Sequence, residues 1–265
     1  MLYFLKLGGS LITDKTIPHT LRAETLKRIA SEIADGLQYR QDLQLVIGHG
    51  SGSFGHMPAS KYGTRDGVDS AEKWWGFVEV YRDARALNQM VLEALLDAGL
   101  PVIAFPPSAG VIAEDGKIRS WDLQPMQAAL TTGLIPLING DVIFDTGRGG
   151  TILSTEELFA HLATQLAPRR ILLAGIEAGV WEDFPACTRL VETITSASYH
   201  PASPGLTGSA AVDVTGGMRQ KVEIMLELAK TIQGLETLIF SGEEAGLVYQ
   251  AVLGDLPGTC VRAEL

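Results

Sequence analysis

Short apolar runs recur along the chain and alternate with longer segments of helical periodicity. The first run, residues 2–7, leads directly into a Gly-Gly turn, and the second, residues 43–48, enters a longer glycine-rich loop. Apolar runs of this length, bounded by turn residues, are typical of strands that are buried on both faces of a sheet. The runs predict seven strands, over residues 2–7, 43–48, 101–105, 134–140, 170–175, 236–242 and 259–264.

Between these runs, apolar residues are spaced as on one face of a helix. Residues 21–37 carry leucine or isoleucine at five helically spaced positions, and residues 218–232 predict a second helix. Another helix is expected directly after the glycine-rich loop. Residues 141–150 resemble a hairpin with a glycine-rich tip. Residues 182–217 are rich in Pro, Ser, Thr and Gly and predict irregular structure.

Two further helices are predicted from their first turns. Asp69 and Glu72 stand three residues apart ahead of a long helical run through Leu96, as in a capping box. Ser154 and Glu157 form the same pattern ahead of a shorter helix that ends near residue 166. Apolar strands that alternate with amphipathic helices indicate an α/β protein, with a mostly parallel sheet covered by helices on both faces. Ligands of such folds bind at the carboxyl ends of the strands.

Composition and charge narrow the classes of function. The chain has 265 residues, of which 46% are hydrophobic, enough for one large α/β domain or two closely joined lobes. Its formal charge of −10 disfavours general binding to nucleic acid or to an anionic membrane surface. The N-terminal apolar stretch is short and contains Lys6, so neither a signal peptide nor a membrane span is expected. Two distant cysteines match no metal-ligand spacing and fit a reducing, cytoplasmic compartment.

The sequence "GHGSGSFGH", residues 48–56, is the densest glycine cluster. It satisfies the dinucleotide fingerprint G-x-G-x-x-G, but it follows the second strand and no acidic strand end comes about 20 residues later. It also resembles a Walker A loop, but His56 and Met57 stand where Lys and Ser or Thr are required. The property common to both motifs remains, since a glycine turn before a helix directs several N–H dipoles toward an anion. His56 adds a side-chain donor suited to a small phosphate or phosphonate. The alternative is a tight turn with a capping histidine.

Two other glycine turns carry nearby lysines. "KLGGS", residues 6–10, places Lys6 at the end of the first strand, and Lys15 follows soon after. "TGGM", residues 215–218, precedes the helix that carries Lys221. Taken alone, each lysine is also consistent with a residue whose ammonium group simply extends to solvent. Three such turns on one sheet favour phosphate binding instead.

Together the motifs resemble the amino acid kinase superfamily, and within it the isopentenyl phosphate kinases. The resemblance spans nearly the whole chain, in order through "KLGGSLITDK", "GHGSGSFGH", "NGDVIFD", "LSTEELFAHLA", "AGVWEDFP" and "VTGGMRQKV". Its most specific part is "HGSGSFGH", because most relatives that phosphorylate a carboxylate or carbamate lack the closing histidine. Isopentenyl phosphate kinases have it, and so do the related fosfomycin kinases.

The resemblance implies a fold, cofactors and an assembly. The fold is an open three-layer αβα sandwich in one amino acid kinase-like domain over residues 1–265. Residues up to about 165 would bind the acceptor, and the rest would bind ATP. The resemblance also implies Mg²⁺, held mainly by ATP and water with no assigned protein ligand, and a homodimer. Asp141 and Asp145 are candidate second-shell acids, with a turn or cap role as the alternative.

The resemblance also assigns roles to residues by position. The implied catalytic residues are Lys6, Lys15, His56, Glu156 and Lys221. The implied ATP-binding residues are Lys6, Gly8, Gly9, Ser10, Gly52, Gly179, Asp183, Gly217 and Lys221. The implied acceptor-binding residues are Ser51, Gly52, Gly55, His56 and Gly140.

The sequence departs from the family pattern at two places. Family members often carry Asp where Glu156 stands, an acid that orients the catalytic lysines, and Glu156 also fits a first-turn helix acid. The segment 175–183 differs from the commoner nucleotide pattern. A prenyl acceptor needs an apolar pocket, for which the candidates are Trp74, Trp75, Phe77, Met90 and Val91, although their helical spacing also fits plain core.

The sequence supports one function and leaves others open. The expected reaction transfers the γ-phosphoryl group of ATP to isopentenyl phosphate, which gives isopentenyl diphosphate and ADP for isoprenoid synthesis. A kinase of another small phosphate or phosphonate, such as fosfomycin, fits the same loop. A nucleotide-binding regulatory module without catalysis is the third reading, against which Lys6, His56 and Lys221 together argue.

Overall fold

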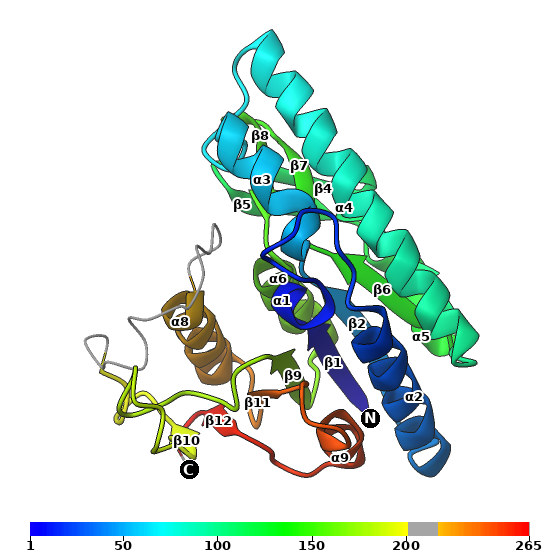
Figure 1. Cartoon of the computed structure of the whole chain (residues 1–265), viewed down its shortest axis with the longest axis vertical. Coiled ribbons are helices and arrows are strands. Elements are labelled where there is room, and N and C mark those ends of the chain that lie inside the picture. Colours follow the sequence, from blue (N-terminus) through cyan, green and yellow to red (C-terminus); the bar gives the residue numbers. More distant parts are fainter. Residues whose placement is uncertain (201–216, 265) are drawn as a thin grey trace.

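The structure is a computed structural model and describes residues 1–200 and 217–264. Its large sheet has eight strands in the order β10-β12-β11-β9-β1-β2-β6-β3 (Figure 1). Only the β11–β12 pair of this sheet is antiparallel, so the predicted, mostly parallel sheet is confirmed. The strands are β1 Leu2–Leu7, β2 Gln44–His49, β3 Val102–Ala104, β6 Ile135–Asn139, β9 Arg170–Gly175, β10 Thr193–Ile194, β11 Glu236–Ser241 and β12 Thr259–Arg262.

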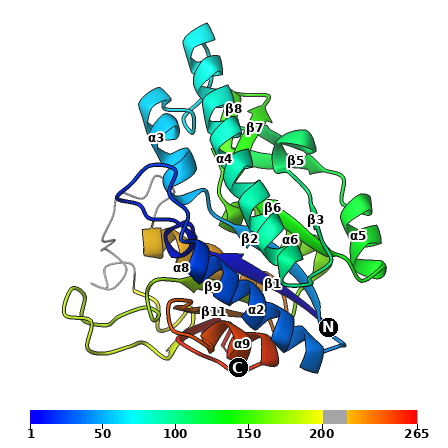
Figure 2. The ribbon, with the colours of Figure 1, turned by 45° about the vertical axis from the view of Figure 1, so that its right-hand side comes forward.

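Helices cover both faces of this sheet, which confirms the predicted αβα sandwich. One face packs on α2 (Ala23–Tyr39), α4 (Ala71–Asp97) and α9 (Leu247–Leu253), and α2 and α9 lie side by side (Figure 2). The other face packs on α5 (Gln124–Thr131), α6 (Thr155–Leu166) and α8 (Gly217–Thr231). Successive side chains of β1 alternate between the faces, with Leu5 and Leu7 in the first core and Phe4 in the second. Lys6 therefore points toward α6 and α8.

A smaller sheet stands beyond the end of the large one. Its strands follow the order β5-β4-β7-β8, with β4 Val111–Glu114, β5 Lys117–Trp121, β7 Asp141–Asp145 and β8 Gly149–Leu153. The β7–β8 pair is the predicted hairpin. The helix α3 (Gly52–Tyr62) and the first half of α4 pack on this sheet through Ala59, Phe77 and Val80. The long helix α4 thus contacts both sheets (Figure 1).

Several local features differ from the sequence prediction. The capping box of α6 is confirmed, but the long helix α4 is capped by Ser70, whose hydroxyl accepts from the Lys73 N–H. Asp69 forms an ion pair with Lys73 instead of capping. The elements that the pattern did not predict are α1 (Gly9–Ile12), the 3-10 turn η1 (Pro107–Ala109), β4, β5, α5, β10 and α9.

Candidate active site

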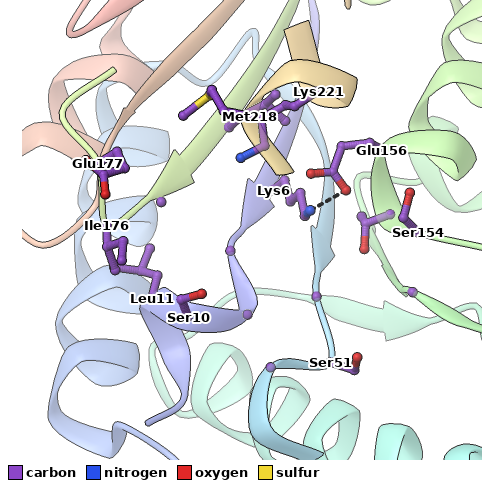
Figure 3. A pocket seen from close by; sticks show the side chains of 18 of the residues that line it. Lys6, Ser10, Leu11, Ser51, Ser154, Glu156, Ile176, Glu177, Met218 and Lys221 are labelled. Carbon is purple, nitrogen blue, oxygen red and sulfur yellow. Dashed lines mark ion pairs between the residues drawn. The ribbon is translucent and has the colours of Figure 1, made fainter. Parts of the chain in front are cut away.

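A cleft of about 890 Å³ lies at the carboxyl ends of β1, β2, β6, β9 and β11 (Figure 3). Eleven of the sequence-predicted site residues line it, although they come from segments up to 215 positions apart in the chain. They are Lys6, Gly8, Gly9, Ser10, Lys15, Ser51, Gly52, His56, Gly140, Glu156 and Lys221. The rule that ligands of α/β proteins bind at strand carboxyl ends therefore holds for this chain.

The N-terminal ends of several helices open into the cleft. Lining residues include Gly9 at the start of α1, Gly52 at the start of α3, Thr155 at the start of α6 and Met218 in the first turn of α8. The longer of these helices present unpaired N–H groups and a positive dipole end there. Among the described lining residues, three lysines stand against two glutamates. The cleft therefore concentrates positive charge in a chain whose net charge is −10.

Lys6, Glu156 and Lys221 meet at the base of the cleft, although they come from β1, α6 and α8 (Figure 3). Lys6 forms an ion pair with Glu156, and both side chains are nearly buried. Burial by itself raises the pKa of Glu156, but the charges of Lys6 and Lys221 and the Lys6 hydrogen bond outweigh it and hold that pKa below its usual value. Glu156 is therefore an anion that orients one lysine and attracts another.

Gly48 explains how α6 comes close enough to Lys6. Gly48 is the register partner of Lys6 on the neighbouring strand β2. A Cβ atom at this position would lie 2.6 Å from Thr155 Cγ2 and 2.8 Å from Phe159 Cζ, closer than packed atoms approach. The absent side chain lets the first turn of α6 rest on the sheet, where the Thr155 hydroxyl donates to the His49 carbonyl at 2.7 Å. This contact places Glu156 beside Lys6.

The loop that carries Lys15 is fastened at both ends. Asp14 accepts from the backbone N–H and the hydroxyl of Thr16, at 2.8 and 2.6 Å, which forms a tight turn around Lys15. Farther along, His19 Nε2 lies 2.8 Å from Asp83 Oδ2 on α4. The His19 ring also packs edge-on against Phe54 of α3. These contacts hold the loop at the cleft without using the Lys15 ammonium.

A second, narrow and mostly apolar cavity adjoins the cleft at His56. Ser51, His56, Gly140 and Ile152 line both spaces, so His56 stands at their junction. The apolar walls come from Ala59 of α3, Val80 and Ala84 of α4, and Ile152 of β8. The apolar cavity therefore extends from the cleft at His56 into the space between α3, α4 and β8.

The two acids of the "NGDVIFD" segment have different surroundings. Asp145 accepts hydrogen bonds from the backbone N–H groups of residues 115, 116, 147 and 148, so it stabilises turns of the small sheet. Asp141 lines the apolar cavity, where burial raises its pKa to about 6 against hydrogen bonds from Ser108 and Val142. Asp145 thus has the turn role, and Asp141 is a buried acid beside the acceptor cavity.

Four further predicted residues lie outside the main cleft. Gly55 lines the adjoining cavity, and Gly217 begins α8 with a φ of +65°. Gly179 packs against Thr259, and Asp183 accepts from Thr188 and Arg189 within its own loop. Neither residue lines the cleft, so their nucleotide contacts stay predictions. The predicted turn "TGGM" lies partly outside the described residues, since 215 and 216 are among those not described.

The aromatic and apolar residues suggested for a prenyl pocket lie elsewhere. Trp75 and Met90 are exposed, and Val91 is buried in the core against the large sheet. Trp74 and Phe77 pack on each other and on Phe144 of the small sheet. None of the five lines the apolar cavity, whose α4 residues are Val80 and Ala84 instead. A prenyl-pocket role for those five side chains therefore stays a prediction, and the plain-core alternative fits Phe77 and Val91, which are buried.

The sequence prediction missed a set of lining residues around the ends of β9 and β11 and the start of α8. They are Leu173, Ile176, Glu177, Met218, Ile239 and Phe240. All except Met218 of α8 lie at the carboxyl ends of β9 and β11, which was the available signal, since both strands were predicted. Apart from Glu177, these side chains give this part of the cleft apolar walls.

His49 connects the second glycine loop to α4 although it does not line the cleft. Its buried ring places Nδ1 3.1 Å from the Gly50 carbonyl and Nε2 2.9 Å from the Asn88 side-chain amide. The atom of Asn88 at Nε2 is Oδ1, and both this oxygen and the Gly50 carbonyl only accept, so the neutral ring donates its one N–H to one of them. Burial, aided by the charge of Lys6, lowers the pKa of His49. The ring therefore stays neutral and links α4 to the loop.

This lowered pKa predicts a loss of stability in acid. The unfolded chain binds a proton at His49 near the usual pKa of about 6.5, which the folded chain resists. The free energy of unfolding therefore falls as the pH drops below about 6.5, by up to about 1.4 kcal/mol per pH unit. His49→Gln removes this contribution, so urea titrations between pH 5 and 6.5 should show a flatter pH dependence for the variant. Asp141, whose raised pKa acts in the opposite direction, titrates in both proteins and cancels in the comparison. Parallel curves would contradict the prediction.

The comparison with known proteins decides the family. The model of the amino acid kinase family matches residues 1–241. The chain belongs to the amino acid kinase family. Isopentenyl phosphate kinase from Methanocaldococcus jannaschii is 32% identical over 98% of each chain, and the enzyme of that name from Haloferax volcanii is 34% identical over 99% of each. A solved isopentenyl phosphate kinase structure superposes with a TM-score of 0.82, covering 98% of this chain and all of its own at 30% identity. The resemblance predicted from the sequence is thereby confirmed.

Two negative findings apply to the described part of this amino acid kinase. No helix within it is long and apolar enough to cross a membrane. No cluster of three or more His, Cys, Asp or Glu side chains within residues 1–200 and 217–264 is arranged to hold a metal ion.

Proposed function

We propose that the protein is an isopentenyl phosphate kinase that transfers the γ-phosphoryl group of MgATP to isopentenyl phosphate. The observation that carries this proposal is the junction at His56, where a cationic cleft adjoins a small apolar cavity. A prenyl phosphate has the matching form, with an anionic head and a short hydrocarbon tail. The relatives of that name, at 32 and 34% identity over nearly the full chain, support the same activity.

The apolar cavity favours a prenyl acceptor over a compact phosphonate. Val80 and Ala84 of α4, with Ala59 and Ile152, form its apolar walls, whereas its polar lining consists of Ser51, His56, Arg65 and Asp141. Burying a hydrocarbon tail there is favourable by about 0.8 kcal/mol for each CH₂ group removed from water. A ligand without such a tail gains nothing from these walls. The homodimer and the cytoplasmic location that the resemblance implies belong to this proposal as well.

The chemistry requires positioning and charge neutralisation more than proton transfer. The acceptor is already an anion, so one of its phosphate oxygens attacks the γ-phosphorus without a general base. As the new P–O bond forms, the bond from the γ-phosphorus to the β,γ-bridging oxygen breaks, and ADP leaves with that electron pair. Lys6 and Lys221 neutralise the charge that spreads over the transferred group. Gly9 holds it through its backbone N–H group, whereas the Gly8 N–H donates to the Ala174 carbonyl, and His56 binds the acceptor phosphate.

The remaining residues of the cleft bind ATP. Lys15 approaches the terminal phosphates from its fastened loop, and the first turn of α8 contributes helix N–H groups. Mg²⁺ enters as part of the substrate MgATP, held by phosphate oxygens and water. Glu156 serves as the fixed anion that keeps Lys6 directed at the transferring group.

The test is an ADP-release assay with three acceptors compared under the same conditions. Isopentenyl phosphate should give the highest kcat/KM, with dimethylallyl phosphate close to it because it has the same number of carbons. Fosfomycin, which lacks the tail, should be at least about 10-fold poorer, since one tenfold corresponds to about 1.4 kcal/mol of lost contact. Preference for fosfomycin would replace the proposal with the phosphonate reading. Absence of turnover with every acceptor would favour a regulatory module.

A further inference from the structure

The two glycine turns that lie along the cleft are in direct backbone contact. Gly9 follows β1, Gly52 follows β2, and these strands are neighbours in the large sheet. A Cβ atom at Gly9 would lie 2.5 Å from the Gly52 nitrogen, and one at Gly52 would lie 2.7 Å from the Gly9 carbonyl oxygen. Only two residues without side chains fit at this distance. Under the proposed function, the first turn holds the transferred phosphoryl group and the second holds the acceptor phosphate.

Thr13 joins these two turns. Its hydroxyl donates to the Gly9 carbonyl at 2.7 Å and accepts from the Ser53 N–H at 2.9 Å. The side chain is buried, with the residue only 1% exposed, and a Cβ atom on Gly52 would collide with the hydroxyl. One hydroxyl therefore bonds to both turns at their closest approach, with no space for water between them.

The hydroxyl acts on geometry and does not bind the substrate. Thr13 is absent from the residues that line the cleft or the acceptor cavity. The Gly9 carbonyl also accepts from the Thr13 backbone N–H at 2.9 Å, so α1 keeps its closing bond when the hydroxyl is removed. What the hydroxyl alone provides is the connection to Ser53 in the first turn of α3.

We propose that Thr13 is a positioning residue that sets the separation between the phosphoryl-donor turn and the acceptor turn. Phosphoryl transfer requires reacting atoms about 3–3.5 Å apart and in line, and a misplacement of about 1 Å costs about 100-fold in rate. The substrate-binding side chains Lys6, His56 and Lys221 are all retained when the hydroxyl is removed. Loss of the hydroxyl therefore lowers kcat and leaves both KM values nearly unchanged.

The experiment compares Thr13→Val, which keeps the shape and removes the hydroxyl, with Thr13→Ser, which keeps the hydroxyl. Thr13→Val should lower kcat by about 10- to 100-fold, with KM for ATP and for isopentenyl phosphate within about threefold of the wild type. Thr13→Ser should retain kcat within about threefold. Thr13→Ala replaces Thr13→Val if the valine protein does not fold by circular dichroism, under the same criteria.

Thr259 offers a matched control. Its hydroxyl donates to the Val191 carbonyl at 2.6 Å and accepts from the Val180 N–H at 2.8 Å, and the residue is fully buried. Thr259→Val thus removes the same pair of bonds from a residue that does not line the cleft. It should lower the melting temperature as Thr13→Val does, while kcat at saturating substrates stays within about threefold.

The outcomes separate this inference from the proposed function. Absence of isopentenyl phosphate turnover in the wild type contradicts the proposed function before any variant is compared. Wild-type turnover together with an unchanged kcat in Thr13→Val overturns the role of Thr13 alone. An equal loss of kcat in Thr259→Val also overturns it, because the effect would then follow from general destabilisation.

Discussion

Replacing Lys6 by methionine should lower kcat by about 1,000-fold. The ammonium of Lys6 is lost from the place where charge develops on the transferred group, and such preorganised donors contribute about 100- to 1,000-fold or more. Methionine keeps the length of the side chain, so packing between β1 and α6 changes little. The measurement is a single-turnover rate with saturating MgATP and isopentenyl phosphate.

The same change should destabilise the protein, which requires a control. Glu156 would remain buried with Lys221 as its remaining lysine neighbour, and breaking a buried pair costs up to about 3–5 kcal/mol. The double variant Lys6→Met, Glu156→Gln removes the unbalanced charge and should recover most of the free energy of unfolding. It should not recover kcat. Recovery of activity together with stability would show that Lys6 acts only as a structural ion-pair partner.

His56→Ala should lower kcat/KM for isopentenyl phosphate by about 10- to 100-fold. A hydrogen bond to a charged group contributes about 1.5–3 kcal/mol, and His56 stands where the cationic cleft meets the apolar cavity. KM for ATP should stay within about twofold, since His56 lies on the acceptor side. Steady-state kinetics with each substrate varied in turn provide both values.

His56→Gln distinguishes donation from packing at this position. Glutamine keeps an N–H donor of similar reach, so it should retain part of the activity that alanine loses. An unchanged kcat/KM for the acceptor in His56→Ala would contradict the assigned role. A rise in KM for ATP alone would instead place His56 on the nucleotide side.

The sheet could be predicted because its strands are uniformly buried runs. β1, β2 and β9 are apolar along nearly their whole length. Glycine turns directly follow β1 and β2, which indicates that the site lies at the carboxyl ends of these strands. The helix α9 could not be predicted, because it has seven residues and its first turn is capped from another helix. Glu32 of α2 accepts from the N–H groups of Val248 and Tyr249, about 215 positions away in the chain. A contact between residues so far apart in the sequence leaves no local pattern from which α9 could be predicted.

Residues of the candidate site could be predicted at positions where close backbone approach or a required charge allows few residue types. Gly9, Gly52 and Lys6 fulfil requirements that few other residues meet, so their spacing indicated the phosphate turns. The acceptor cavity was not predictable, because α4 changes partner along its length. Val80 packs on the small sheet, whereas Val91 packs on the large sheet, and periodicity alone assigns both to one buried face. The sequence therefore predicted the glycine and lysine residues that line the cleft more reliably than the residues that line the apolar cavity.

The placement of the two glycine turns on neighbouring strands has a consequence for the evolution of acceptor specificity. The hydrogen-bonded ladder of β1 and β2 brings the two turns side by side, with about 4.8 Å between strands, and Thr13 joins the turns beyond the ladder. Under the proposed function, the walls that face the acceptor body belong to α3, α4 and β8, which are not part of that ladder. Substitutions at Val80 or Ala84 can therefore change which acceptors fit while the geometry of transfer is conserved. A single catalytic framework can in this way be inherited by kinases of different small molecules.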